Sequence, residues 1–104
     1  MKVFDIVPPE KAHNLKDVIK HSHLTYISGD ITKKEDLDGV VTPDLDLIYH
    51  LSAVVGVNKY IDNPMGVIDV NVIGTKNILE LASRNGTKVL FTSTSEVYGK
   101  NPNV

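Results

Sequence analysis

The 104-residue sequence contains no cysteine and no long apolar run. Without cysteine, the chain has neither disulfide bonds nor thiolate metal sites. We expect neither a signal peptide nor a membrane span, because the sequence has no apolar h-region and no run of about 20 apolar residues. The formal charge of −2 arises from scattered charges of both signs, which does not indicate binding to nucleic acid or to a membrane surface. These absences predict a soluble, cytoplasmic protein.

Four short apolar segments bounded by turn or polar residues predict β-strands. They cover residues 1–7, 23–28, 45–51 and the segment from Lys88 to Phe91. The chain is long enough for one domain with a modest core, and we see no linker or internal repeat. We therefore treat residues 1–104 as a single unit.

Three further segments predict helices. Residues 10–21 carry apolar side chains at helical spacing. A capping box from Thr32 to Glu35 predicts a short helix that ends at about Val41. The longest helix is predicted to begin at Asn63-Pro64 and to run to about Arg84, before Asn85-Gly86 forms a left-handed cap.

The predicted long helix carries two adjacent apolar stripes. One consists of Val67, Val70, Gly74, Ile78 and Leu81, and the other of Ile68, Val72 and Leu79. A helix that is apolar over so wide an arc is expected to pack on the sheet and on a second partner. The element order β-α-β-α-β-α-β predicts an α/β fold with a parallel sheet and helices on both faces, and flavodoxin-like and Rossmann-like topologies fit it equally well.

The stretch from Lys88 to Gly99, KVLFTSTSEVYG, is the strongest candidate for a functional site. Its apolar start is typical of a strand buried on both faces. Polar side chains then follow at the carboxyl end of the strand, where open α/β sheets bind ligands. These are Thr92, Ser93, Thr94, Ser95, Glu96 and Tyr98. A solvated turn is the alternative interpretation, but three adjacent groups that donate, accept and exchange protons favour a site.

Single polar residues elsewhere leave two interpretations open. Asp5 stands at a strand end, where it could bind a ribose hydroxyl or simply be solvated. Asp30 could accept from an adenine amine or bond its own backbone. Asn71 lies among apolar residues of a helix, so it marks either a helix–strand tie or an active-site scaffold. His21 and His23 have no carboxylate or cysteine at ligand spacing, so no metal site is expected.

Four ordered motifs resemble the extended short-chain dehydrogenase/reductase family, the NAD-dependent epimerases, dehydratases and decarboxylases of nucleotide sugars. The motifs are Gly29-Asp30-Ile31, LIYHLSA at residues 47–53, DVNVIGT at residues 69–75 and STSEVYG at residues 93–99. The resemblance implies NAD as the cofactor, a nucleotide sugar as the substrate and a partial NAD(P)-binding Rossmann-like domain over residues 1–104. The shared first step is transfer of a hydride from a sugar hydroxyl to NAD.

The resemblance also implies roles for individual residues. The cofactor-binding positions are Asp5 for the ribose, Asp30 and Ile31 for the adenine, Leu51, Ser52 and Ala53 for the backbone wall along the cofactor, Thr92, and Asn71 as the family's structural asparagine. Thr94 matches the residue that holds the sugar hydroxyl. Glu96, with Ser95 beside it, matches the acid/base position of dehydratases and decarboxylases.

Two family motifs do not occur in this sequence. There is no GxxGxxG phosphate loop, which the resemblance places before residue 1. There is no Tyr-x-x-x-Lys pair either, because the residues four positions after the tyrosines are Asp30, Ala53, Pro64 and Pro102. We therefore expect a central slice of a domain roughly three times longer, without turnover on its own because it has no base for the sugar hydroxyl. A non-catalytic module that binds a nucleotide or a partner is the alternative.

Loss of the first strand has a structural consequence. We expect the strands around Val3 and Val89 to face a gap, or to pair with each other or with another chain. We also expect self-association, as a homodimer, through the helix at residues 64–84, because the resemblance places that helix in a dimeric four-helix interface.

Overall fold

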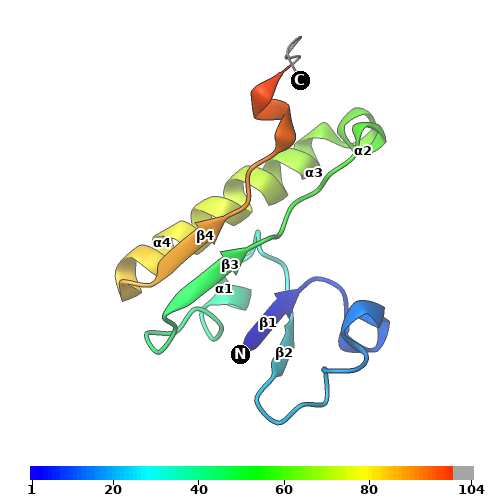
Figure 1. The fold of residues 1–104 in the computed structure, drawn as a ribbon. Helices are drawn as coiled ribbons and strands as arrows, with labels where there is room; N and C mark the ends of the chain where they lie inside the picture. Colours follow the sequence, from blue (N-terminus) through cyan, green and yellow to red (C-terminus); the bar gives the residue numbers. More distant parts are fainter. Residues whose placement is uncertain (100–104) are drawn as a thin grey trace.

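The computed structural model describes residues 1–99 and contains four short strands and one long helical rod in this range (Figure 1). The strands are β1 (Lys2–Asp5), β2 (Thr25–Ser28), β3 (Leu47–His50) and β4 (Lys88–Phe91). The helices are α1 (Lys34–Leu37), α2 (Val57–Asp62), α3 (Pro64–Ile68) and α4 (Thr75–Asn85), with a π-helical segment at Asp69–Gly74 and 3-10 turns at Pro9–Lys11, His13–Leu15 and Ser95–Tyr98. No helix within residues 1–99 is long and apolar enough to cross a membrane.

The four strands form two parallel pairs, which confirms the predicted parallel α/β class. In one pair Val3 of β1 is the partner of Tyr26 in β2, and in the other Ile48 of β3 is the partner of Val89 in β4. No ladder of hydrogen bonds joins the two pairs in the described part of the chain. Figure 1 shows β1 and β3 as the facing members of the two pairs. The gap therefore lies between β1 and β3, and its expected placement beside the Val89 strand is wrong because β3 covers the inner edge of that strand.

Both strand pairs contribute to one apolar core. The buried members are Ile31, Leu37, Val41, Ile78 and Leu81, with Phe4, Ile48 and Val70 packed against them. Phe4 belongs to β1 and Ile48 to β3, so side-chain packing connects the two pairs where backbone hydrogen bonds do not. Burial of apolar surface under α4 is therefore the main force that holds the two strand pairs together.

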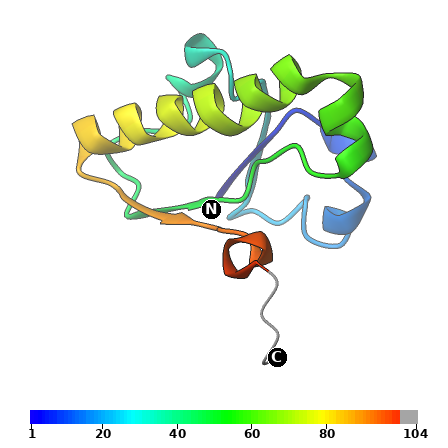
Figure 2. The same ribbon diagram turned by 90° about the horizontal axis from the view of Figure 1, so that it is seen from above.

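The long helical rod runs from α3 through the π-helical segment into α4 and covers one face of β3 and β4 (Figure 2). Its predicted ends are confirmed. The Asn63 side chain accepts from the Gly66 N–H at 3.0 Å, and Gly86 ends α4 with a φ of 70°. Gly74 is required for close packing, because a Cβ atom there would lie 2.6 Å from Cγ2 of the buried Ile31.

The two apolar stripes of the rod have different environments. The first stripe faces the core, with Val67, Ile78 and Leu81 all buried. The second stripe is exposed, and Ile68, Val72 and Leu79 are 47%, 57% and 48% accessible to solvent. The sheet therefore covers only half of the apolar arc.

Three local expectations are wrong. Residues 10–21 form two 3-10 turns instead of an amphipathic helix, and their apolar Val18 remains 45% exposed. A helix of about 12 residues is marginal in water without a surface to pack on. Likewise, the Thr32 hydroxyl donates to Asp30 at 2.8 Å rather than capping a helix, so α1 begins at Lys34 with no side-chain cap.

The strand at Val89 is also less buried than expected. Leu90 and Phe91 are 44% and 58% exposed, so β4 is not buried on both faces. β4 pairs with β3 alone, and the rod packs on only one of its faces (Figure 2). An apolar strand is fully buried only where layers cover both of its faces.

Candidate functional site

The predicted site residues meet at one edge of the fold, where the parallel strands end (Figure 1). Asp5 is the last residue of β1, and Asp30 follows the end of β2 by two positions. Residues 51–53 follow β3 directly, and Thr92 follows β4. This convergence comes from strand direction alone, because parallel strands place all of their carboxyl ends on one side.

Asp5 is exposed, and it shapes the loop that follows it. One of its carboxylate oxygens, Oδ1, accepts from the Val7 N–H at 2.9 Å. The Tyr26 hydroxyl donates to the Val7 carbonyl at 2.7 Å, so the loop is held from β2 as well. Burial raises the pKa of the Tyr26 phenol, and the negative charges of Asp5 and Glu10 raise it further. Tyr26 therefore remains a hydrogen donor at neutral pH.

Asp30 is already engaged by its own turn. Its Oδ1 atom accepts from the Thr32 N–H at 2.9 Å and from the Thr32 hydroxyl at 2.8 Å. These bonds, together with the positive charge of Lys33, hold the pKa of the carboxyl below its usual value. The backbone N–H of Asp30 donates to Asp36 at 2.8 Å. Asp30 is thus an ionised group bonded to its own turn, which agrees with the second of the two interpretations, and the adenine contact stays a prediction.

Asn77 holds the same turn from the helix side, and sequence reasoning missed it. Its side chain is 3% exposed, and Nδ2 donates to the carbonyls of Ile31 and Thr32 at 3.0 and 3.1 Å. A signal was present, because Asn77 is a polar residue directly beside Ile78 of the buried stripe. A buried amide must find partners, and here those partners lie next to the predicted adenine position.

Asn71 fixes the loop between β3 and α2. Its Oδ1 atom accepts from the Val54 N–H at 2.8 Å, and its Nδ2 atom donates to the Val54 carbonyl at 3.1 Å. One amide thus satisfies both backbone groups of Val54. The expected helix–strand tie is therefore wrong in its partner, because Asn71 ties the helix to the loop after β3. Leu51, Ser52 and Ala53 lie between this anchor and β3, so their backbone is held at both ends.

The segment after β4 continues the candidate site. The Thr92 hydroxyl donates to the His50 carbonyl at 3.3 Å, which joins the ends of β4 and β3. Thr94 is exposed, and its carbonyl accepts from the Val97 N–H at 3.4 Å as the chain enters the 3-10 turn Ser95–Tyr98. The side chains of Ser95 and Glu96 lie outside the described part of the chain, so their roles stay predictions.

The two histidines of the His21-x-His23 pair contact each other. Their ring centroids lie 5.6 Å apart, and the His23 N–H donates to His21 Nδ1 at 3.2 Å. The described residues contain no group of three or more side chains with metal-ligand chemistry. The candidate site is therefore a set of loops and carboxylates at the strand ends.

A parallel sheet with anchored loops at the carboxyl ends of its strands defines a Rossmann-type α/β protein. The chain belongs to the GDP-mannose 4,6 dehydratase family, whose family model matches residues 5–104. The resemblance to NAD-dependent epimerases and dehydratases of the short-chain dehydrogenase/reductase type is thereby confirmed.

Curated relatives include nucleotide-sugar decarboxylases. The chain is 43% identical over 86 residues to UDP-glucuronic acid decarboxylase 5 of Arabidopsis thaliana, a match that covers 83% of this chain and 24% of the relative. It is 46% identical over 55 residues to a UDP-N-acetyl-alpha-D-glucosaminuronate decarboxylase of Bacillus cytotoxicus, which covers 53% of this chain and 17% of that relative. The chain thus spans about a quarter or less of the length of these relatives.

Solved structures share the architecture. A double mutant of the dTDP-glucose 4,6-dehydratase of Streptomyces venezuelae, with NAD bound, matches with a TM-score of 0.85 at 28% identity and covers 97% of this chain and 32% of that chain. A UDP-N-acetylglucosamine 4-epimerase of Methanobrevibacter ruminantium matches with a TM-score of 0.80 at 28% identity, covering 99% of this chain and 33% of that one. Both strand pairs therefore have counterparts within one domain of a longer chain.

Proposed function

We propose that this chain is the nucleotide-binding part of an NAD-dependent enzyme that oxidises the sugar of a nucleotide sugar. The observation that carries the proposal is the placement of Asp5, Asp30 and residues 51–53 at the carboxyl ends of parallel strands in the two pairs. The family match over residues 5–104 and the NAD in the bound structure of the Streptomyces dehydratase support it.

The proposed cofactor contacts lie along this edge. The exposed Asp5 carboxylate would accept hydrogen bonds from a ribose, and the turn at Asp30 and Ile31 would receive the adenine. Leu51, Ser52 and Ala53 would line the cofactor with backbone and small side chains, and Thr92 would extend that wall. NAD supplies the chemistry of accepting a hydride, while the chain's own residues bind and orient it.

The substrate side of the site would lie after β4. Thr94 would hold the sugar hydroxyl that is oxidised, and Glu96 with Ser95 would exchange protons with the sugar. The decarboxylases among the relatives favour a uronic acid sugar, in which oxidation beside the carboxylate prepares the loss of carbon dioxide. A general base for the sugar hydroxyl must come from residues outside these 104, because the sequence contains no Tyr-x-x-x-Lys pair. We place this activity in the cytoplasm.

A second candidate function is a non-catalytic module that binds a nucleotide through the same edge. A gene that encodes no glycine loop upstream of this segment, or that stops after Val104, would favour it. The two functions differ in one property, which is turnover of a nucleotide sugar by the longer protein that contains this segment.

Mapping of the bound nucleotide tests the proposal on this chain. Addition of NAD to an isotope-labelled sample is expected to shift the backbone amide signals of Asp5, Asp30, Ile31 and residues 51–53, because these loops surround the proposed adenosine position. ADP-ribose is expected to shift the same signals, since it lacks only the nicotinamide. Amide shifts confined to another face of the molecule would contradict the proposed site.

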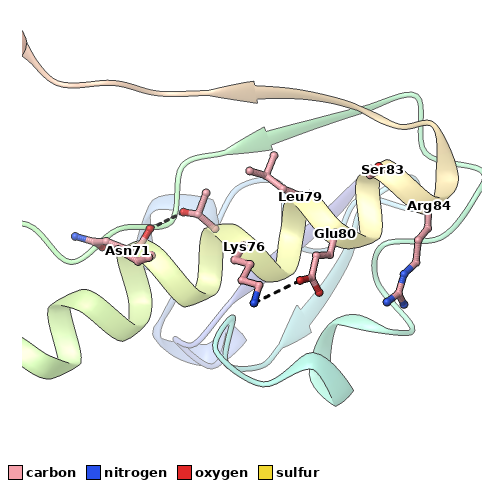
Figure 3. Close-up of a pocket in the computed structure, with 8 residues that line it drawn as sticks. Asn71, Lys76, Leu79, Glu80, Ser83 and Arg84 are labelled. Carbon is pink, nitrogen blue, oxygen red and sulfur yellow. Dashed lines mark hydrogen bonds and ion pairs between the residues drawn. The ribbon is translucent and has the colours of Figure 1, made fainter.

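Self-association through the rod is a further part of the proposal. The stripe of Ile68, Val72 and Leu79 is exposed, and its members Val72 and Leu79 line an open groove of about 670 Å³. Figure 3 shows Leu79 on this side of α4 together with Lys76 and Glu80, which form an ion pair at 3.7 Å. A second copy would cover this apolar surface, and charged neighbours would limit nonspecific contacts. Sedimentation equilibrium is expected to show a dimer that Leu79→Glu dissociates, whereas a wild-type monomer at all concentrations would refute this interface.

A further inference from the structure

A buried histidine closes a chain of hydrogen bonds behind the candidate site. His50 ends β3 with 4% of its surface exposed, and its Nε2 atom lies 2.8 Å from the Thr75 hydroxyl. The Thr75 hydroxyl donates its only proton to the carbonyl of Asn71 at 2.7 Å. Toward His50 it can therefore act only as an acceptor, so the hydrogen of that bond belongs to His50 Nε2. The contacts thus assign the tautomer of the neutral ring.

The same chain of bonds continues into the loop after β3. Asn71 uses both polar atoms of its side chain on Val54, at 2.8 and 3.1 Å. Hydrogen bonds therefore link His50 to Thr75, Thr75 to Asn71 and Asn71 to Val54. We call this chain of bonds the bracket. It begins at His50, the residue before the loop, and returns to the chain at Val54, the residue directly after Ala53. The loop between these points contains no hydrogen-bonded regular structure of its own.

The helix is irregular where the bracket crosses it. Asn71 lies within the π-helical segment Asp69–Gly74, and Thr75 is the first residue of α4. In a π-helical turn the backbone bonds run from residue i to residue i+5. Thr75 stands four residues after Asn71, so its side-chain hydroxyl reaches the carbonyl that its own N–H would bond in an α-helix. The Thr75 hydroxyl thus stabilises the irregular helical turn from which the Asn71 side chain reaches Val54.

We propose that His50 and Thr75 are positioning residues that orient Asn71 and thereby hold the loop of Leu51, Ser52 and Ala53 in shape for a nucleotide cofactor. The inference rests on the proposed function, because that function makes this loop the wall of the cofactor site. Neither residue touches the cofactor itself, and each acts through the bonds described above. Sequence reasoning did not identify either one.

The environment of His50 gives the bracket a pH dependence. Its interactions come from neutral groups, the Thr75 hydroxyl on α4 and the Phe91 ring on β4, whose centroid lies 5.5 Å away. Burial lowers the pKa of His50 below its ordinary value. The unfolded state then takes up the proton first, so the contribution of neutral His50 to stability is complete above about pH 6.5 and declines as the pH falls from there toward the folded pKa.

A matched pair of variants at Thr75 tests the bracket. Thr75→Val keeps the shape of the side chain and removes the hydroxyl, whereas Thr75→Ser keeps the hydroxyl. In Thr75→Val we expect the amide signals of Val54 and of the Asn71 side chain to shift and to exchange faster with solvent, and the affinity for NAD to fall about tenfold. Thr75→Ser is expected to retain the wild-type amide shifts, exchange rates and affinity for NAD. Nitrogen chemical shifts of His50 should report hydrogen on Nε2, with a protonation midpoint below that of the unfolded chain.

The readouts separate this inference from the proposed function. Unchanged Val54 and Asn71 signals in Thr75→Val, or hydrogen on Nδ1 of neutral His50, would overturn the bracket whether or not NAD binds. Changed signals with unchanged NAD affinity would overturn the positioning role. If the wild-type chain binds no NAD, the proposed function fails for this chain, and the amide and histidine signals still decide the bracket. Should Thr75→Val not fold, His50→Gln against His50→Leu makes the same comparison, because glutamine retains an N–H donor.

Discussion

Replacement of Asn71 by leucine is expected to lower the free energy of unfolding by about 3 kcal/mol, because it strips two partly buried backbone groups of their partners. The side chain bonds both the N–H and the carbonyl of Val54, and leucine has a similar size but no polar atom. Urea denaturation followed by circular dichroism measures the change. Amide exchange at Val54 should also become faster, since its N–H loses its acceptor.

The matched control for this variant is Asn58→Leu. Asn58 is an exposed asparagine on α2, so the same chemical change there is expected to alter stability by no more than about 0.5 kcal/mol. Equal effects of the two substitutions would mean that Asn71 has no special structural role. That result would contradict the proposed role of Asn71 in holding the loop of residues 51–53.

Leu37→Ala is expected to lower the free energy of unfolding by about 3 kcal/mol or more, because the variant buries less apolar surface and leaves a cavity in the core. Leu37 is the largest fully buried side chain of the described residues, and it packs in the cluster that joins the two strand pairs. A domain of this size is stable by only about 5 to 15 kcal/mol, so this loss is a large share of the total. The thermal melt of the variant should therefore shift to a much lower temperature.

Leu90→Ala is the matched control for the core variant. Leu90 is 44% exposed on β4, so truncation there is expected to cost less than about 1 kcal/mol. A cooperative melt of Leu37→Ala at the wild-type temperature would show that the shared core does not hold the strand pairs together.

Much of the fold could be predicted from local patterns in the sequence. Apolar runs placed all four strands to within a few residues, and Asn63-Pro64 and Gly86 marked the ends of the long rod. The parallel order of the strands then brought Asp5 and Asp30 to one edge. These features depend on short-range chemistry and on chain direction, so no tertiary contact was needed to infer them.

Other features depend on partners distant in the sequence. Residues 10–21 have helical spacing but form two 3-10 turns, in which no apolar side chain is fully buried and Val18 stays exposed. The Thr32 hydroxyl had two possible partners, and the Asp30 carboxylate outcompeted the helix cap. The bond between His50 and Thr75 joins residues 25 positions apart. Only the packing of the rod against β3 brings these two side chains together.

The most direct test of the central claim is a thermal melt of the 104-residue chain with and without excess NAD, beside the variant Asp5→Ala. Asp5 is exposed and makes only a local hydrogen bond to Val7, so its loss should leave the fold intact. A ligand at a hundred times its dissociation constant stabilises a protein by about 2.7 kcal/mol. We predict a clear upward shift of the melting temperature for the wild type and a smaller one for Asp5→Ala. Equal shifts, or no shift for the wild type, would contradict a nucleotide site at this edge.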